Sequence, residues 1–465
     1  METLNENASD QSIRFKKAVP IILLLFIFTL IVNNSFRIIS TDLAKEFGLS
    51  PSVVSWQVTL ASLVIGIGAV VYASLTDTIS VRTLLSIGII LMCVGSLMGY
   101  IFQHSFIMIV ISRVIQSAGL ASAETLYVVS VTKYLPVHEQ KKFFGFSTMG
   151  FAISQVLGMM AGGFISTYIH WTVLFLIPLL TLIILPFILK LLPKEKMKKG
   201  RIDVVGLFLV ACIAGSLIMY VSEFNWIYLI TFIVAICFFI LFISKSDKGF
   251  IDITFFKNKL FLKVIAITFP LYTLQLAYIF MFPFLFEKLY GLSLDTISLL
   301  FIPVYVIAAA IGATSGKIAK FLSTEQCIYI AITLITASFL VGGFFVNSSE
   351  VILVICMTFL AGSFALMYAP WFDTLVGAVP EEKSGTAIGF YNLSFNIAAS
   401  IGIAYVASMM SSKALKGGWL DYLSTGNEAL YSNILIILGL ISLICMGFYW
   451  LLIARGTTNT TITKD

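Results

Sequence analysis

Two charged side chains, Arg113 and Glu124, lie in the middle of "ISRVIQSAGLASAETL", residues 111–126, a segment otherwise apolar enough to cross a membrane. A charge at the centre of a bilayer costs at least about 2.5 to 3.5 kcal/mol, so intramembrane charges are usually functional. At about 100° per residue, the eleven-residue spacing returns Glu124 to nearly the face of Arg113, about 16 Å further along a helix. Glu124 is therefore a candidate proton carrier, and Arg113 a candidate relay or charge-balancing group. The alternatives are an arginine that reaches the headgroups and a glutamate that only shapes the field of a vestibule.

A further carboxylate, Asp77, lies near Arg82 in the connection "ASLTDTISVRTLL". Asp77 can accept hydrogen bonds from the N-terminus of the following helix or from a basic partner, and such a contact can hold one conformation closed. We expect Asp77 and Arg82 to gate the protein, with Asp77 a second candidate for proton coupling. The alternative is that both residues only set the topology.

Uncharged polar side chains at span depth are candidates for binding a substrate, although each can instead bond a neighbouring helix, for which about 0.6 kcal/mol is typical. Arg37, near the outer end of its span, either lines a cavity or lies at the interface, and Tyr278 can either stack on a flat ring or pack. The candidate substrate-binding residues are Asn33, Arg37, Gln57, Gln116, Gln155, Gln275, Tyr278, Asn392 and Asn396.

The elements that must position these residues are membrane helices. The chain is 59% hydrophobic and only 11% charged, against about 25% charged in soluble domains, which excludes a soluble protein. Fourteen apolar runs are each long enough to cross a hydrocarbon core of about 30 Å. Basic residues precede the first run but no small-residue cleavage site follows it, so we expect it to remain as a span. The runs begin near residues 18, 52, 82, 105, 142, 171, 203, 225, 261, 296, 326, 350, 385 and 431.

The basic residues predict the orientation, because Lys and Arg are retained on the cytoplasmic side. With both termini in the cytoplasm, only Lys45, Lys288, Lys413 and Lys416 fall in outer segments. The net charge of +6 therefore reflects topology and contact with anionic lipid headgroups, not nucleic acid. The oligomeric state is not determined by these patterns.

Metal and enzyme chemistry are not predicted. The six cysteines stand singly in apolar runs without metal-ligand spacing, and the three histidines fall in connections. We expect no enzyme activity, no metal site and no cofactor, except that a divalent cation can travel with a substrate.

An internal repeat divides the chain. Pro136, Gly145 and Phe146 recur 244 residues later at Pro380, Gly389 and Phe390, and "YASLTDTIS" aligns with "TSGKIAKFLS", placing Lys320 opposite Asp77. Two facing six-helix halves are typical of secondary transporters, with the substrate site near the midplane. We therefore expect a tail (1–17), an N-terminal six-helix bundle (18–192), basic loops with two inserted helices (193–260), a C-terminal six-helix bundle (261–454) and a tail (455–465).

Three motifs resemble those of the major facilitator superfamily. The connection containing Leu75, Asp77 and Arg82 resembles the loop after the second helix, and "RVIQSAG" resembles the helix-4 motif through Arg113 and Gln116. "SQVLGMMAGGF" is similar to the helix-5 antiporter motif, and this resemblance implies a role in conformational gating for Gly158, Gly162 and Gly163.

With fourteen spans, "IGAVVYASLTD" and "FISTYIHW", the chain resembles the K and L classes of Gram-positive tetracycline efflux proteins and a staphylococcal relative of them. That family exchanges protons, and in some members Na⁺ or K⁺, for a tetracycline-metal complex. The resemblance implies an all-α major facilitator fold in the bacterial cell membrane and proton-coupled export of a small-molecule drug. The positions of the family's intramembrane glutamates are Asn33, Gln155 and Ala399 in this sequence.

The expected function is proton-coupled export of tetracycline or a related drug. The alternatives are a multidrug or metabolite exporter, an importer, a monovalent cation/proton antiporter, and, from another class, a membrane sensor that transports nothing. A sensor predicts a signalling domain or long tail, for which the C-terminal "RGTTNTTITKD" is too short.

Overall fold

The computed structural model describes residues 2–76, 78–135, 137–192, 203–245, 258–318, 320–377, 384–417 and 426–451, and these residues form helices and no strand. Within these ranges, 14 segments are long and apolar enough to cross a membrane. Each begins within four residues of the start expected from the sequence. The fourteen-span prediction is confirmed because the length of an apolar run is a local property of the chain.

The N-terminal half consists of six spans and two short helices. Its long helices are α1 (Glu2–Ile38), α4 (Trp56–Leu75), α5 (Val81–Ile101), α6 (Phe106–Tyr134) and α7 (Val137–Tyr168). Between α1 and α4 lie the short helices α2 (Ser40–Phe47) and α3 (Pro51–Val54). We call the end of the bundle that carries α2 the outer end, because both chain termini are predicted to be cytoplasmic.

The sixth span differs from the uniform helix expected there. It is divided into the 3₁₀ helices η1 (Trp171–Phe175) and η2 (Ile177–Ile183) and the helix α8 (Leu185–Leu191). Pro178 and Pro186 lie in the first turns of η2 and α8. Proline has no N–H to donate, so each of these two removes an α-helical hydrogen bond at a point where one helical piece ends and the next begins.

Two inserted helices and a second six-span half follow. The inserted pair is α9 (Val204–Glu223) and α10 (Trp226–Lys245). The C-terminal half consists of α12 (Lys259–Tyr290), α13 (Leu294–Ile318), α14 (Thr324–Phe344), α15 (Glu350–Gly377), α16 (Ser384–Ser411) and α17 (Asn427–Tyr449), with a 3₁₀ turn η4 (Ala414–Lys416) before α17.

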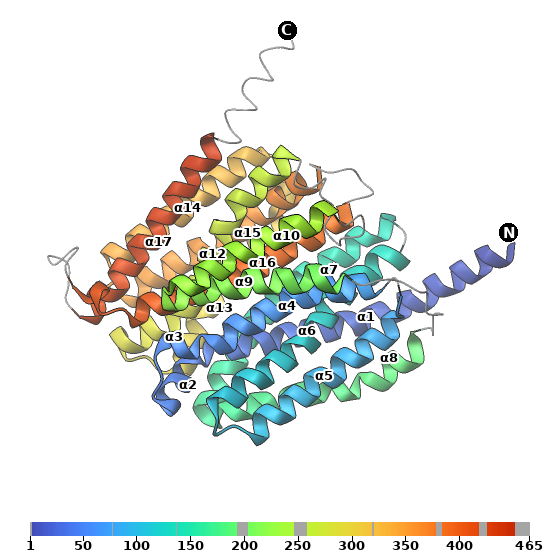
Figure 1. The fold of residues 1–465 in the computed structure, drawn as a ribbon, viewed down its shortest axis with the longest axis horizontal. Helices are drawn as coiled ribbons and strands as arrows, with labels where there is room; N and C mark the ends of the chain where they lie inside the picture. Colours follow the sequence, from blue (N-terminus) through green and yellow to red (C-terminus); the bar gives the residue numbers. More distant parts are fainter. Residues whose placement is uncertain are drawn as a thin grey trace, which may run out of the picture.

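Helix packing follows the repeat inferred from the sequence. In the N-terminal half α1 packs on α7, α4 on α6 and α5 on α6, and the matching pairs in the C-terminal half are α12 on α16, α13 on α15 and α14 on α15. The two halves meet along two matching contacts, α4 with α16 and α7 with α13. Figure 1 shows the blue to cyan helices of the N-terminal half on one side of the bundle and the orange to red helices on the other. The structure is thus two six-helix bundles related by a pseudo-two-fold axis.

The inserted pair lies outside this core. Helix α9 packs against α16 and α4, along one of the two contacts between the halves, and α10 packs against α9. The α10 segment is only 11% buried in the protein, against 72% for the most enclosed span, α12. A strongly apolar helix that leaves most of its surface uncovered is suited to face lipid. In the view of Figure 1, α10 lies across the front of the bundle.

Candidate functional site

Arg113 lies inside the N-terminal bundle with no exposed surface. Its guanidinium donates to Asn33 Oδ1 on α1 at 3.2 Å and to the side chain of Gln116, and its carbon Cζ lies 4.2 Å from the centre of the Phe36 ring. Gln116 in turn donates to Ser96 Oγ on α5 at 2.8 Å. Arg113 Nε has no hydrogen-bond partner among the described residues. The side chain is therefore held in the interior, away from the headgroups, by neutral acceptors alone.

A second polar group surrounds Arg37. One guanidinium nitrogen of Arg37 donates to Asn34 Oδ1 at 2.8 Å, and Asn34 Nδ2 donates to the Ser154 carbonyl oxygen on α7 at 3.3 Å. Arg37 Nε is enclosed and has no partner in the described part of the chain. Glu124 of α6 and Tyr305 of α13 both lie within electrostatic range of Arg37. Arg37 is thus placed in the interior, where charged and polar groups of both halves meet.

The structure identifies the cation that acts on Glu124. The helical spacing places Arg113 on the same face of α6 at about 16 Å, whereas Arg37 of α1 lies within electrostatic range of the Glu124 carboxylate. Arg37 and Arg113 also act on one another, as like charges. Glu124 Oε1 is enclosed without a hydrogen-bond partner among the described residues. No hydrogen bond fixes this carboxylate oxygen, and intramembrane carboxylates commonly take part in proton relays.

Two of the predicted glutamines have different surroundings. Gln57 is fully buried, and its Nε2 donates to the Phe36 carbonyl oxygen at 3.0 Å and to Ser40 Oγ at 3.1 Å, which ties α4 to the end of α1. Gln155, on α7, is 6% exposed, and its Oε1 has no partner among the described residues. Gln57 thus braces two helices, while Gln155 retains an unused acceptor.

The C-terminal candidates are less tightly grouped. Tyr278 of α12 is 1% exposed and stacks on Phe364. Gln275, about one turn earlier in α12, is half-buried. Asn396 of α16 donates to the Asn392 carbonyl oxygen at 2.9 Å. These four candidate residues, Gln275, Tyr278, Asn392 and Asn396, stay predictions for substrate binding.

Tyr305 was not identified from the sequence. It lies on α13, is 7% exposed, and its hydroxyl has no hydrogen-bond partner among the described residues. It lies near Arg37 and near Tyr278. The chain has 18 tyrosines, and no sequence pattern separates Tyr305 from the others. Only its position near Arg37 in the structure does so.

The three motif glycines of α7 lie where helices approach closely. A Cβ added at Gly158 would lie 2.8 Å from the Ile31 carbonyl oxygen, and one at Gly162 would lie 2.6 Å from the Ser35 carbonyl oxygen, both on α1. At Gly163 it would lie 2.7 Å from the Leu294 carbonyl oxygen on α13. Gly158 and Gly162 thus pack α7 within its own half, and Gly163 packs it against the other half.

The predicted cytoplasmic latch is described only in part. Asp77 lies outside the described residues. Arg82 donates to the Leu192 carbonyl oxygen at 3.5 Å, which connects the start of α5 to the end of α8, and Lys320 is exposed. Lys133, at the end of α6, donates to the Thr76 carbonyl oxygen beside the position of Asp77 at 3.2 Å. A gating role for Asp77 and Arg82 stays a prediction.

Several polar contacts join the two halves. Ser400 Oγ of α16 donates to the Thr59 carbonyl oxygen of α4 at 3.1 Å, and the Ser52 N–H of α3 donates to Ser411 Oγ at 3.2 Å.

Two further contacts between the halves, made by charged or phenolic side chains, lie at the outer end. The Lys45 ammonium lies 3.0 Å from the Glu287 carboxylate, connecting α2 with α12, and the Tyr168 hydroxyl donates to the Asp295 carboxylate at 2.8 Å, connecting α7 with α13. We call these two contacts the outer clasp. Sequence reasoning missed all four residues, because nothing in their local patterns pairs one outer segment with another.

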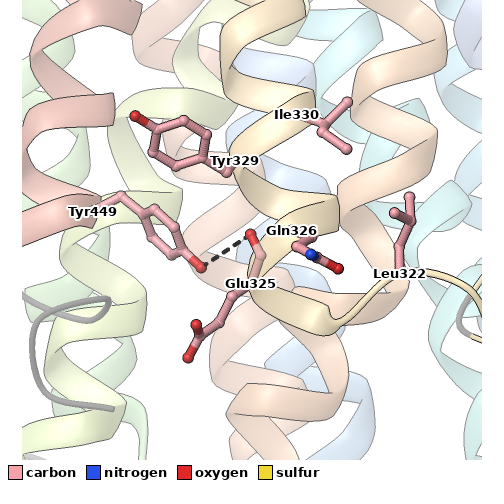
Figure 2. A pocket seen from close by; sticks show the side chains of 6 residues that line it. All are labelled: Leu322, Glu325, Gln326, Tyr329, Ile330 and Tyr449. Carbon is pink, nitrogen blue, oxygen red and sulfur yellow. Dashed lines mark hydrogen bonds between the residues drawn. The ribbon is translucent and has the colours of Figure 1, made fainter. Parts of the chain in front are cut away.

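A separate pocket of about 330 Å³ lies at the other end of the C-terminal half. Figure 2 shows the Tyr449 hydroxyl directed at the Glu325 carbonyl oxygen, at 3.5 Å. Because α14, α17 and the turn before α14 supply the whole lining, this pocket is distinct from the group around Arg37. Its lining residues are Leu322, Glu325, Gln326, Tyr329, Ile330 and Tyr449.

Comparisons with known proteins agree with this architecture. The family model described as Major Facilitator Superfamily matches residues 21–204 and 202–403. The chain is 24% identical over 410 residues to the riboflavin transporter RibZ of Clostridioides difficile, covering 85% of this chain and 88% of that protein. It is also 24% identical over 408 residues to the quinolone resistance protein NorB of Staphylococcus aureus, covering 84% and 87%.

Solved structures show the same fold at low identity. The POT family transporter PepTSo has a TM-score of 0.71 at 13% identity, covering 97% of this chain and 99% of that one. The xylose transporter XylE from E. coli has a TM-score of 0.62 at 15% identity, covering 94% and 96%.

Proposed function

Because the chain belongs to the major facilitator superfamily and is a multi-pass membrane transporter, we propose that it exports tetracycline or a related small-molecule drug in exchange for protons. The site of action is the bacterial cell membrane, with both termini in the cytoplasm. The quinolone resistance protein NorB, a relative along 84% of the chain, supports a drug as substrate.

Glu124 carries this proposal. It is an intramembrane carboxylate with an enclosed, unpaired oxygen, and Arg37 is its cationic neighbour. Intramembrane acids commonly act in proton relays. When Glu124 is ionised, Arg37 stabilises it; when it takes a proton from the outside, that attraction is lost. A drug that binds better to the ionised form then competes with the proton, and competition for one site is what antiport requires.

Arg113 supports the same site from within the N-terminal bundle. Its bond to Asn33 connects α6 with α1, its bond to Gln116 lies within α6, and its charge is within range of Arg37. We expect Arg113 to position Arg37 and Glu124 through this field, without itself carrying the proton, because a guanidinium does not lose its proton in proteins. We expect no resident cofactor, and any divalent cation to arrive with the drug.

A flat heteroaromatic metabolite is a second candidate substrate. The observation that favours it is the similarity to the riboflavin transporter RibZ over 85% of the chain. In this case the substrate differs, but the binding site around Arg37 and Glu124 and the exchange for protons stay the same.

Everted membrane vesicles test the proposal directly. Vesicles that contain the protein are energised, and a pH-sensitive dye reports proton release when tetracycline, a quinolone or riboflavin is added. We expect at least one compound to evoke proton movement that an uncoupler abolishes, and the Glu124→Gln protein, at equal abundance, to evoke none. Proton movement equal to that of empty vesicles for all three compounds would contradict the proposal.

A further inference from the structure

Three charged side chains of the short helix α2 each contact a different element. Asp42 accepts a hydrogen bond from Ser166 of α7, and Glu46 accepts one from the Trp171 indole of η1. Lys45, between them, pairs with Glu287 of α12 in the other half at 3.0 Å. Positions 42, 45 and 46 share one face of a helix. One helical face is thus joined twice to its own half and once to the other half.

The contacts of α2 differ in how well they are shielded from water. Trp171 is 2% exposed, so the bond to Glu46 has one buried partner. In the ion pair, the Lys45 side chain is 60% exposed and that of Glu287 is 22% exposed. Water screens an exposed ion pair, which makes it much weaker than a hydrogen bond from a buried donor to a carboxylate. When the halves separate, the Lys45–Glu287 contact is therefore the one that breaks.

The second contact of the outer clasp has the same character. Tyr168 is 68% exposed, and its bond to Asp295 joins the end of α7 to the start of α13. Below it, the same two helices come so close at Gly163 that a Cβ there would lie 1.7 Å from Ser298 Oγ. The halves are thus tightly packed beneath a weak, water-exposed polar contact.

The C-terminal half has no counterpart of α2 in the described residues. Helix α12 ends at Tyr290 and α13 begins at Leu294, with only residues 291–293 between them. In the N-terminal half, the corresponding connection contains all of α2 and α3. The two bundles therefore differ at the outer end, where only the N-terminal half carries additional short helices.

We propose that α2 is a strap that moves with the N-terminal half, and that the outer clasp opens and closes the outer mouth of the transporter. Lys45–Glu287 and Tyr168–Asp295 hold the mouth closed while the site around Arg37 and Glu124 is loaded. Both break when the halves separate, and the bonds of Asp42 and Glu46 persist. This inference rests on the proposed function for its purpose, which is release of the substrate to the outside.

Charge reversal tests the clasp in the purified protein. In a variant whose six native cysteines are replaced, Ser298→Cys reports opening, because Ser298 is fully buried against α7 in this structure. We expect Lys45→Glu to raise the rate at which a hydrophilic thiol reagent labels this cysteine about 3- to 10-fold, since attraction becomes repulsion. Combining Lys45→Glu with Glu287→Lys should return the rate to its starting value. Lys288→Glu, one residue away and outside the clasp, should leave it unchanged.

A second measurement guards against a reporter that disturbs packing. A short cross-linker should join Tyr168→Cys to Asp295→Cys less efficiently when Lys45→Glu is present, because loss of one contact opens the other. Wild-type rates and yields in Lys45→Glu, or no recovery in the charge swap, would overturn the clasp.

Both measurements are made in lipid nanodiscs without substrate, so they do not depend on export. Labelling that responds as expected while no compound moves protons in vesicles would support the clasp and contradict the proposed function. Normal export by vesicles, together with a labelling rate that no charge reversal changes, would contradict the clasp and leave the proposed function standing.

Discussion

Replacing Gly163 by alanine should hold the outer mouth open. The added Cβ would lie 1.7 Å from Ser298 Oγ, 2.7 Å from Ser298 Cβ and 2.7 Å from the Leu294 carbonyl oxygen. The serine hydroxyl can rotate away, but its Cβ and the backbone oxygen cannot. Helices α7 and α13 must therefore separate for alanine to fit.

The expected magnitude follows from this geometry. Inserting a methyl group into a packed contact costs about 1 to 3 kcal/mol. Because the clash exists only while α7 and α13 are closed, the whole amount shifts the equilibrium between closed and open states, by about 5- to 150-fold. Alanine is the better helix former by up to about 1 kcal/mol, so a loss of function cannot arise from a weakened α7.

Cross-linking measures the closed state. A short bifunctional thiol reagent should join Lys45→Cys and Glu287→Cys, whose native side chains lie 3.0 Å apart, and Gly163→Ala should lower this yield together with the export rate. Gly145→Ala is the matched control, because it lies on the same helix with no atom within 4 Å of an added Cβ. Adding Ser298→Gly to Gly163→Ala removes two of the three clashes and should restore part of the yield.

A Gly163→Ala protein that cross-links and exports like the wild type would show that α7 and α13 need not close at Gly163. An equal loss in Gly145→Ala would show that the effect comes from alanine in α7 and not from contact with α13.

Substitutions at three further positions separate coupling from packing. Glu124→Gln should abolish pH-gradient-driven export while drug binding to the purified protein remains measurable, with Glu124→Asp intermediate; gradient-driven export by the Gln protein would place the proton elsewhere. Arg113→Lys should keep part of the transport rate and Arg113→Ala none, because charge at that depth matters before the fork geometry does; normal export by the Ala protein would make Arg113 a bystander. Gln57→Leu removes two hydrogen bonds worth about 0.5 to 1.5 kcal/mol each, so thermal unfolding in detergent should shift to lower temperature while the folded protein exports normally. A changed drug affinity in Gln57→Leu would indicate substrate contact instead.

The number and position of the spans could be predicted from the sequence. An apolar run either matches the thickness of the hydrocarbon core or does not, and this depends only on neighbouring residues. The repeat was also visible, because duplicated connections keep their spacing at Pro136 and Pro380. Hydropathy did not predict the shape of the sixth span: its hydropathy is among the highest of the fourteen, but the span is divided into 3₁₀ and α-helical pieces near Pro178 and Pro186.

The intramembrane charges could also be identified from the sequence, but the side chains that contact them could not. Arg113 was identified because a charge in an apolar run is costly wherever it points. Its acceptor Asn33 lies 80 residues earlier in the chain, and the cation near Glu124 proved to be Arg37 on another helix. Helical periodicity relates residues of one helix only, so it placed Arg113 on the face of Glu124 at about 16 Å, too far for contact, and could say nothing of Arg37.

Contacts between the halves were decided by the tertiary structure alone. Tyr305 gains its significance because α13 brings it opposite Arg37, and Lys45 because α2 brings it to Glu287. None of these residues lies in a distinctive pattern, since tyrosines and outer-loop charges are common in membrane proteins. The sequence determined which segments cross the membrane and which charges lie within it, because both depend on the local free energy of transfer into lipid. Which side chains these charges contact is determined by the packing of the fourteen helices, because the contacting residues can lie hundreds of positions apart in the sequence.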